Sequence, residues 1–330
     1  MRKVEIAPRT IIFAVFFILG LYFLWIIQDL LFSLFIGFIL MSALKPVVHS
    51  LEKRGIPRKL AAVVAYFSVI FVFITLFSIV LPPIALEGTA LIKNLPTIIA
   101  NLNPTLSAYL QLQTLTQYLP NVTTGAFAFL AGIFSNILFV VTTIFFGFYL
   151  IMEENIIKNF LKHIFNDKKT EQLIGLFDRA EARMSAWFWG QATLMVVVGC
   201  VTFIGLNLIG MRYALSLAVL AGLLEIVPSI GPILSAIPAV LIGFSISSIT
   251  GVATLALYFI IHQFEGNLIV PIIMRRAVGL DPIATLVFLI VGGKIGGIIG
   301  ILLSIPILLF LGTFLTELRR DKSLMEHIFK

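Results

Sequence analysis

Charged residues are scarce in this chain of 330 residues: Asp, Glu, Lys and Arg together make up 12% of it. A soluble domain has about a quarter of its residues charged, so the composition excludes a soluble protein. Hydrophobic residues account for 60% and include thirty phenylalanines. The long uncharged runs favour membrane helices over a membrane β-barrel, whose strands would alternate over about 10 residues.

Motifs for enzyme chemistry and for ATP binding are also missing. The sequence has no GxxxxGK[ST] phosphate loop, no nucleophile elbow and no zincin motif. We therefore predict that the chain is not an enzyme and does not by itself drive transport with ATP. We also predict no cofactor and no metal site, because no two histidines lie near each other in the sequence. Cys200 is the single cysteine, so an intrachain disulfide is excluded.

Long apolar runs predict the membrane segments, each of which needs about 20 apolar residues. Residues 10–44 predict two spans with a tight turn at Gln28 and Asp29, the first span being retained rather than cleaved as a signal peptide. Further spans are predicted at 60–82, 126–151, 186–210 and 249–270, and two longer apolar pieces at 213–243 and 283–316.

The two longer pieces have lengths that suit a helical hairpin. At 31 and 34 residues they are long for one span and short for two, so they predict re-entrant hairpins or tilted, broken helices. Basic residues support this reading, because they gather on the cytoplasmic side of membrane proteins. With both pieces folded back, every basic residue except Lys93, Arg212 and Lys294 lies inside. The net charge of +7 then reflects topology and needs no nucleic-acid partner.

This layout predicts four parts of an all-α integral membrane protein with both termini in the cytoplasm. Residues 1–151 form scaffold spans with an external segment at 83–125, which is either a set of surface helices or a plain loop cap. Residues 152–185 form a cytoplasmic amphipathic segment, in contact with membrane lipid. Residues 186–316 form a transport unit of two span-plus-hairpin repeats, and residues 317–330 a cytoplasmic tail.

An internal repeat supports the two hairpins. The stretch GPILSAIPAVLIG at 231–243 resembles GILLSIPILLFLG at 300–312. Upstream, Gly222 corresponds to Gly292 and Glu225 to Lys294, while Gln191 and Gln263 stand at similar offsets. Two such units entering the membrane from opposite sides are typical of an inverted-repeat transporter.

Four stretches of the sequence resemble the autoinducer-2 exporter family, also described as PurR-regulated permease-like proteins. These stretches are WFWGQ (187–191), GLLEIVPSIGPILSAIPAVLIG (222–243), HQFEGNLIVPIIMRRAVGLDP (262–282) and VGGKIGGIIGILLSIP (291–306). Their order and spacing match the family over nearly the whole chain. One departure is Ser229, which stands where the family commonly has an aromatic residue.

The resemblance implies about eight membrane segments in a prokaryotic inner membrane. It also implies a homo-oligomer, with a pentamer as the expected form, and secondary transport. Members of the family are linked to the export of autoinducer-2 or to the antiport of sodium or lithium against protons. The resemblance therefore implies a small polar solute, a monovalent cation or a proton as the partner of this chain.

The stretch EIVPSIGP places charge and helix breakers inside an apolar run. Pro228 and Pro232 lack the N–H groups that would pair with the carbonyls of Leu224 and Pro228, so we expect two free carbonyls. Freed carbonyls can coordinate a cation or accept a solute hydroxyl, or Ser229 and neighbouring helices can satisfy them. Glu225 precedes the break by one turn and is either a proton or cation carrier or an interfacial residue. Together with Gly231, these residues form the first part of the candidate pathway.

The second part of the candidate pathway lies in later segments. His262 and Glu265 share a helical face three residues apart, with Gln263 beside them, and are predicted to gather with Glu225. Lys294 lies between glycine pairs and either pairs with a glutamate, binds an anionic group or reaches the inner surface. Gln191 either bonds a solute or hairpin carbonyl or links helices.

Three functions remain open from the sequence. The first is a secondary transporter of a small polar, autoinducer-2-like metabolite, coupled to an ion or proton gradient. The second is a sodium (lithium)/proton antiporter. The third is a membrane scaffold or channel without coupled transport, which has no need of broken, charged hairpins.

Overall fold

The computed structural model describes residues 8–72, 74–76, 78–79, 82, 137–153, 156–164, 167–227, 230–274 and 282–320, and these residues form helices and short connections. Several predicted features lie outside the described residues. They are the external segment 83–125, the pathway residues Pro228 and Ser229, the basic pair Arg275 and Arg276, and most of the C-terminal tail.

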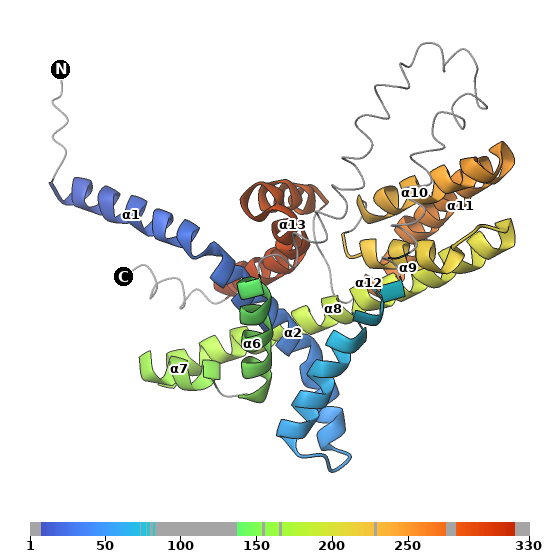
Figure 1. Cartoon of the computed structure of the whole chain (residues 1–330). Helices are drawn as coiled ribbons and strands as arrows, with labels where there is room; N and C mark the ends of the chain where they lie inside the picture. The colour runs from blue at the N-terminus through green and yellow to red at the C-terminus, as the bar shows by residue number, and fades with distance from the viewer. Residues whose placement is uncertain are drawn as a thin grey trace, which may run out of the picture.

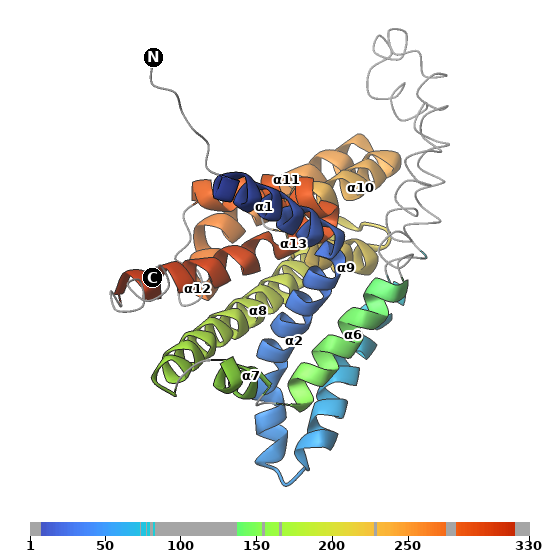
Figure 2. The same cartoon turned by 90° about the vertical axis from the view of Figure 1, so that its left-hand side faces the viewer.

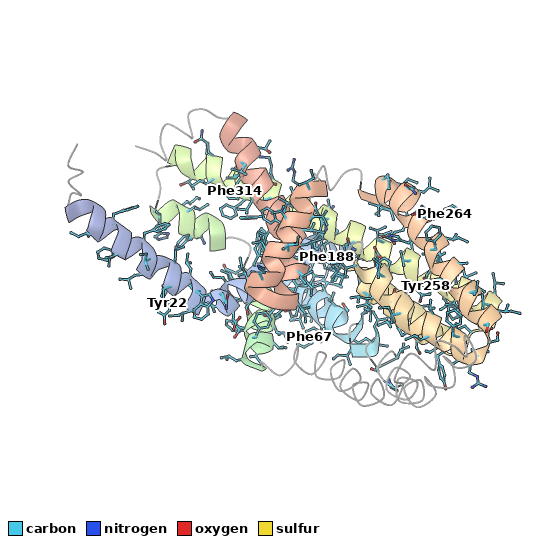
Figure 3. The ribbon with its side chains drawn as sticks, turned by 90° about the horizontal axis from the view of Figure 1, so that it is seen from above. Tyr22, Phe67, Phe188, Tyr258, Phe264 and Phe314 are labelled. Carbon is cyan, nitrogen blue, oxygen red and sulfur yellow. The ribbon has the colours of Figure 1, made fainter. Side chains whose placement is uncertain are left out.

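The first two helices meet in a bend rather than a reversal. Helix α1 spans Pro8–Ile26 and α2 spans Gln28–Glu52, with Ile27 alone between them. The hydrogen-bond ladder continues across the joint, from Ile27 N to Phe23 O and from Leu31 N to Ile27 O. The predicted tight turn at Gln28 and Asp29 is therefore wrong, because helical bonding crosses it. Helix α1 points away from the other helices and leaves its apolar side chains, such as Tyr22, exposed (Figures 1 and 3).

Three helices pack side by side to form the N-terminal bundle (Figure 2). They are α2, the helix Arg58–Leu76 and α6, which spans Ile137–Met152. Gly37 of α2 lies against the backbone of Gly147 in α6, where a Cβ atom would come within 2.9 Å of its nitrogen. The hydroxyl of Tyr66 donates a hydrogen bond of 3.0 Å to the carbonyl of Ile144. Small residues thus let the helix backbones approach closely, as they do in membrane bundles.

Helix α8 runs the length of the molecule and contacts most of the other elements. It spans Asp167–Ile209, and its 43 residues are about 65 Å long. It follows α7, which spans Ile156–Ile164. Residues 167–185 of the predicted cytoplasmic segment and the predicted span 186–210 therefore join in one continuous helix, whereas α7 is a separate helix. Lys45 of α2 forms an ion pair of 2.7 Å with Glu181 of α8, and Trp189 donates a hydrogen bond of 3.0 Å to Ala43 O.

The piece 213–243 folds back on itself as a helical hairpin. Its arms are α9, spanning Ala214–Leu224, and α10, spanning Ile230–Ile246. Both ends of the hairpin contribute to one buried cluster, in which Ala214 and Leu217 of α9 pack with Ile242 of α10. The arms are therefore antiparallel. Arm α9 is about 17 Å long and so is too short to cross the hydrocarbon core of about 30 Å.

The next membrane helix changes its winding near its end. Helix α11 spans Ser248–Phe264 and begins at an N-cap in which the Ser247 hydroxyl accepts a hydrogen bond of 3.0 Å from Thr250 N. It continues into the π-helix η1, spanning Glu265–Ile269, and then into α12, spanning Val270–Met274.

The piece 283–316 is the second hairpin. Helix α13 spans Pro282–Arg320 but is broken at Gly296 and Gly297, the latter with a φ of +56° that favours glycine. The arms touch on both sides of this break, since Gly292 lies against Gly300. The hydroxyl of Ser304 donates a hydrogen bond of 2.8 Å to Phe288 O on the opposite arm.

In both hairpins, a glycine at the equivalent position of the sequence repeat allows the two arms to approach closely. Gly231 lies against the carbonyl of Leu224, and Gly300 lies against the carbonyl of Gly292. In each case the second arm reaches the first arm's backbone only because the glycine has no Cβ atom. The repeat therefore marks two structurally similar hairpins.

Two buried clusters hold the helices together, and α8 contributes to both. The larger cluster joins α2, the helix Arg58–Leu76, α8 and the second arm of α13. Within it, Phe310 packs edge-on against Phe35 and Phe38 with ring centroids 5.7 and 5.8 Å apart. The smaller cluster joins the C-terminal half of α8 with α9, α10 and α11. The two hairpins thus contribute to different buried clusters.

Five of the described helices are long and apolar enough to cross a membrane. They are Gln28–Glu52, Arg58–Leu76, Thr170–Ile209, Ser248–Ile273 and Ile283–Thr316. Four shorter apolar helices accompany them. Large apolar side chains cover the outside of these helices (Figure 3). The fold is therefore that of an all-helical, multi-pass membrane protein.

Candidate functional site

Two glutamates from different segments meet inside the molecule. Glu225 caps the C-terminus of α9 and is 1% exposed, and Glu265 opens the π-helix η1 and is 3% exposed. Their two carboxyl groups are near neighbours and interact electrostatically with each other. The sequence prediction that Glu225 and Glu265 gather is consistent with this placement. We refer to the two residues as the carboxyl pair.

The carboxyl pair is suited to hold a proton. Two ionised carboxylates close together in a buried site would repel each other strongly. A carboxylate only accepts hydrogen bonds, so the two groups can bond to each other only when one of them is protonated. The oxygens Oε2 of Glu225 and Oε2 of Glu265 are buried and have no hydrogen-bond partner in the described residues. The pair can therefore accept a proton or a cation.

Gln191 of α8 links the pair to the long central helix. Its Nε2 donates a hydrogen bond of 2.6 Å to the backbone carbonyl of Glu225. This bond fixes the orientation of the side-chain amide, because the reverse orientation would place two oxygens together. Its Oε1 is buried and has no hydrogen-bond partner in the described residues. The sequence left open whether Gln191 bonds a solute or hairpin carbonyl or links helices. In the structure it bonds a hairpin carbonyl.

His262 connects the buried pair to the molecular surface. Its Nδ1 lies 3.6 Å from Oε2 of Glu265, and 39% of its side chain is exposed. The distance exceeds that of a hydrogen bond, so a small rotation would make or break the contact. Within the described chain, no Lys or Arg forms an ion pair with Glu225 or Glu265. Of the described Lys, Arg and His side chains, only that of His262 lies within 4 Å of a carboxyl oxygen of the pair.

The π-helix sets the position of Glu265. A π-helix is rare, and single π-turns within α-helices occur frequently at functional sites. Here the wider turn starts at Glu265, three residues after His262, and its backbone N–H groups pair five residues back, as from Val270 N to Glu265 O. The altered winding separates Glu265, which is buried, from Gly266 and Asn267, which are exposed.

The tip of the first hairpin differs from the sequence prediction in one respect. The carbonyl of Leu224, predicted to be free, accepts a hydrogen bond of 3.1 Å from Val227 N. The helix tightens at its end, so an N–H three residues on replaces the one that Pro228 lacks. Gly231 and Pro232 are buried beside this turn at the start of α10.

Two predicted pathway residues lie away from the carboxyl pair. Lys294 is exposed near the break of α13 and forms no ion pair with Glu225 or Glu265. Of the three readings that the sequence left open for Lys294, the ion pair with a glutamate is not formed in this structure. Gln263 is exposed on the outside of α11, since one position along the helix turns it away from Glu265.

Two buried hydroxyl groups escaped the sequence analysis. Thr202 Oγ1 of α8 and Tyr258 OH of α11 are buried and have no hydrogen-bond partner in the described residues. Tyr258 precedes Glu265 by seven residues and Thr202 follows Gln191 by eleven, so each shares a helix face with a residue of the site. This spacing could have indicated the two hydroxyl groups in the sequence. It is a weak indication because threonine and tyrosine are common in membrane helices.

These features define a multi-pass helical membrane protein in which a helical hairpin, a π-helix and the central helix α8 surround a buried carboxyl pair. The chain belongs to the AI-2E family of transporters, whose model matches residues 11–320. The resemblance seen in the sequence is therefore confirmed, and the family is one of transporters rather than enzymes.

Several bacterial proteins are similar to this chain over most of its length. "Putative transport protein YueF" of Bacillus subtilis (strain 168) is 29% identical over 320 residues, which cover 90% of this chain and 86% of that protein. "Putative transport protein YhhT" of Escherichia coli (strain K12) is 27% identical and covers 86% and 82% of the two chains. "Putative permease PerM" of the same organism is 24% identical, with 91% and 90% covered.

Proposed function

We propose that this protein is a secondary transporter in which Glu225 and Glu265 carry the coupling proton or monovalent cation. The observation that supports this most directly is that two buried carboxyl groups lie together, each with an oxygen that has no hydrogen-bond partner in the described residues. A buried ionisable group in a membrane is costly, and such groups mark ion and proton pathways. The solute is proposed to be a small polar metabolite resembling autoinducer-2.

The site offers a two-state switch for coupling. In one state the pair shares a single proton. In the other state that proton is exchanged for a cation, which the oxygens of Glu225, Glu265 and Gln191 would ligate. His262 is half-exposed and sits next to Glu265, so it is placed to pass the proton between the pair and the surface.

The hairpins are proposed to be re-entrant and to move during transport. Arm α9 is too short to cross a bilayer, and its end carries one carboxyl of the pair. The other carboxyl belongs to the helix α11–η1. A shift of the hairpin against α11 would therefore separate the carboxyl groups and change their affinity for the proton or cation. We also propose that the N- and C-termini lie in the cytoplasm of a prokaryotic cell.

Sodium (lithium)/proton antiport is the second candidate function. It is favoured by one observation: the three unpaired side-chain oxygens of Glu225, Glu265 and Gln191 are acceptors only. Acceptor oxygens suit a hard monovalent cation and give nothing to an anion. In this case no organic solute would be needed for the exchange.

Flux measurements in proteoliposomes test the proposal. The purified protein would be reconstituted with an internal pH dye, and an imposed gradient of protons, Na⁺ or Li⁺ would be combined with a labelled polar solute. Coupled transport predicts proton movement that depends on the solute, whereas antiport predicts proton movement on adding Na⁺ or Li⁺ alone. A scaffold or channel without coupling predicts neither.

Two variants locate the coupling. Glu225→Gln and Glu265→Gln keep the side-chain shape but remove the exchangeable proton, so each is expected to reduce coupled flux at least tenfold. Glu171→Gln is the matched control, because Glu171 is exposed at the start of α8, outside the site. Wild-type flux in both site variants would refute the role of the pair.

The exposed apolar surface of helix α1 supports an oligomer. Helix α1 is apolar all round and nearly every described side chain on it is exposed, so lipid or a second copy of the chain has to cover it. We propose a homo-oligomer, with a pentamer as the expected number, built on the N-terminal helices. Native mass spectrometry of the protein released from detergent measures this number, and a monomer at all concentrations would contradict it.

A further inference from the structure

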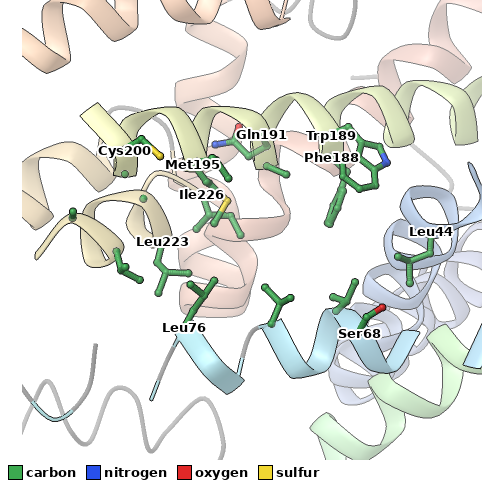
Figure 4. A pocket seen from close by; sticks show the side chains of 18 of the residues that line it. Leu44, Ser68, Leu76, Phe188, Trp189, Gln191, Met195, Cys200, Leu223 and Ile226 are labelled. Atoms are coloured by element: carbon green, nitrogen blue, oxygen red, sulfur yellow. The ribbon is translucent and has the colours of Figure 1, made fainter. Parts of the chain in front are cut away.

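A cavity of about 660 Å³ lies between the N-terminal bundle and the first hairpin (Figure 4). Its walls come from α2, the helix Arg58–Leu76, α8 and α9. Its volume lies within the range of small-molecule sites. Figure 4 shows Leu76 and Ser68 on one side of the space, with Met195 and Gln191 on the other.

The wall of this cavity is almost wholly apolar. Among the described residues, no Asp, Glu, Lys, Arg or His lines it. The polar side chains are few: the Ser68 hydroxyl donates to Val64 O in its own helix, Gln191 Nε2 donates to Glu225 O, and Gln191 Oε1 has no hydrogen-bond partner in the described residues. A polar solute would lose its hydrogen bonds to water here and find almost none in exchange. The cavity is therefore not the solute site of the proposed transporter.

The cavity is open to the outside of the described helices along an apolar surface. Exposed apolar side chains flank the opening, including Val72, Val196 and Leu215. Along α8 the lining runs from Trp187 to Phe203, about 24 Å, which exceeds the roughly 15 Å of one leaflet's hydrocarbon. The space is long, apolar and continuous with the lipid-facing surface.

We infer that this cavity binds one acyl chain of a membrane phospholipid between α9 and the helix Arg58–Leu76. An apolar cavity takes up apolar ligands rather than water, and empty space of this size would forfeit the dispersion contacts of its lining. Acyl chains are the apolar molecules that surround these helices at the highest concentration. The lipid headgroup remains outside, because the wall has no charged side chain to bind it.

The bound chain would lie directly beside the carboxyl pair without touching it. Gln191 forms part of the cavity wall and at the same time bonds the backbone of Glu225. Leu223 and Ile226 of the first hairpin form another part of the wall. The acyl chain therefore packs against the hairpin and would limit how far α9 can approach the N-terminal bundle. This consequence for transport rests on the proposed function, whereas the binding site itself does not.

Tryptophan fluorescence provides the test, because the chain has only three tryptophans and two of them line the cavity. Trp187 is 6% exposed, so lipids around the outside of the protein contact it little. The variant with Trp25→Phe and Trp189→Phe leaves Trp187 as the single fluorophore. This variant would be reconstituted in phosphatidylcholine with unlabelled or with brominated acyl chains, since bromine quenches tryptophan at close range.

An acyl chain in the cavity predicts strong quenching of Trp187 by brominated lipid. Filling the cavity in the same background with Ala192→Phe on α8 or Val72→Phe on the opposite wall is expected to reduce that quenching at least twofold. Ile204→Phe is the matched control, because Ile204 is an exposed residue of α8 outside the cavity and should leave the quenching unchanged. Circular dichroism and gel filtration confirm that each variant is folded.

Two results would overturn the inference. Equal fluorescence of Trp187 in brominated and unbrominated lipid would mean that no acyl chain enters, as expected if a second copy of the chain fills the space. Quenching that persists in both filled variants would mean that the lipid approaches Trp187 from elsewhere. Neither result depends on transport activity, so failure of this inference and failure of the proposed function are distinguishable.

Discussion

The side-chain amide of Gln191 donates a hydrogen bond of 2.6 Å to the backbone carbonyl of Glu225. The donor lies on the central helix α8, and the acceptor lies at the end of α9, where the hairpin turns. This bond satisfies a carbonyl that the end of the helix would otherwise leave unpaired inside the protein. The other atom of this amide, Oε1, is buried and has no hydrogen-bond partner in the described residues.

Removal of the Gln191 amide should lower both the stability of the protein and its coupled flux. Gln191→Met keeps the length of the side chain but leaves the Glu225 carbonyl without its donor, at a cost of about 1–2 kcal/mol in the free energy of unfolding. The cost is partly offset because the unpaired Oε1 disappears as well. Reversible unfolding in mixed micelles measures the stability, and the proteoliposome assay measures the flux.

Thr193→Val is the control for Gln191→Met. Thr193 lies on the exposed side of α8 and bonds only the carbonyl of Trp189 in its own helix. Its replacement should change stability by less than about 0.5 kcal/mol. If both variants behaved alike, the link between α8 and the hairpin would have no energetic importance.

Adding a methyl group to Gly231 or Gly300 should open the corresponding hairpin. In each position a Cβ atom would collide with a backbone carbonyl of the other arm, Leu224 or Gly292, and backbone cannot yield as a side chain can. Overpacking of this kind costs about 1–3 kcal/mol. Stability of Gly231→Ala and Gly300→Ala in mixed micelles provides the measurement, with hydrogen exchange showing which hairpin has loosened.

Gly312→Ala is the matched control for these glycine variants. Gly312 lies in the same helix as Gly300, but no atom lies within 4 Å of the position that its Cβ would take. Alanine has a higher helix propensity than glycine, so this variant should be stabilised by up to about 1 kcal/mol. Equal destabilisation of all three variants would argue against the close approach of the hairpin arms.

Loss of the Ser304 hydroxyl should loosen the second hairpin while leaving the first intact. This hydroxyl bonds the carbonyls of Phe288 on the opposite arm and Gly300 on its own arm. Ser304→Ala is expected to cost about 1 kcal/mol and to raise hydrogen exchange around the break of α13. Thr316→Ala serves as the comparison, because the exposed Thr316 hydroxyl bonds only Gly312 in its own arm.

Neutralising Lys294 should leave the stability of the protein unchanged. Lys294 is exposed and pairs with neither glutamate of the carboxyl pair. Lys294→Met should therefore shift the free energy of unfolding by less than about 0.5 kcal/mol. Loss of several kcal/mol, as expected for breaking a buried ion pair, would show that Lys294 does contact a carboxylate during the transport cycle.

The sequence by itself determined the class of the protein and the positions of most helices. Apolar runs of about 20 residues have the length of a membrane-spanning helix. The spans predicted at 60–82 and 249–270 accordingly correspond to helices in the structure. The repeat at 231–243 and 300–312 marked the second arms of both hairpins, because each needs a glycine facing the opposite backbone. The four resemblance stretches identified the family.

Only the tertiary structure decided which of the candidate residues meet. Glu225 and Glu265 lie 40 positions apart, and nothing in the local sequence states that the π-helix brings the second carboxyl to the first. An ion pair of Lys294 with a glutamate was equally open from the sequence, but the Lys294 hairpin contributes to a different buried cluster and forms no such pair. Local hydropathy specifies helices one at a time, whereas contacts between them depend on how small residues and large side chains fit along the whole length of α8.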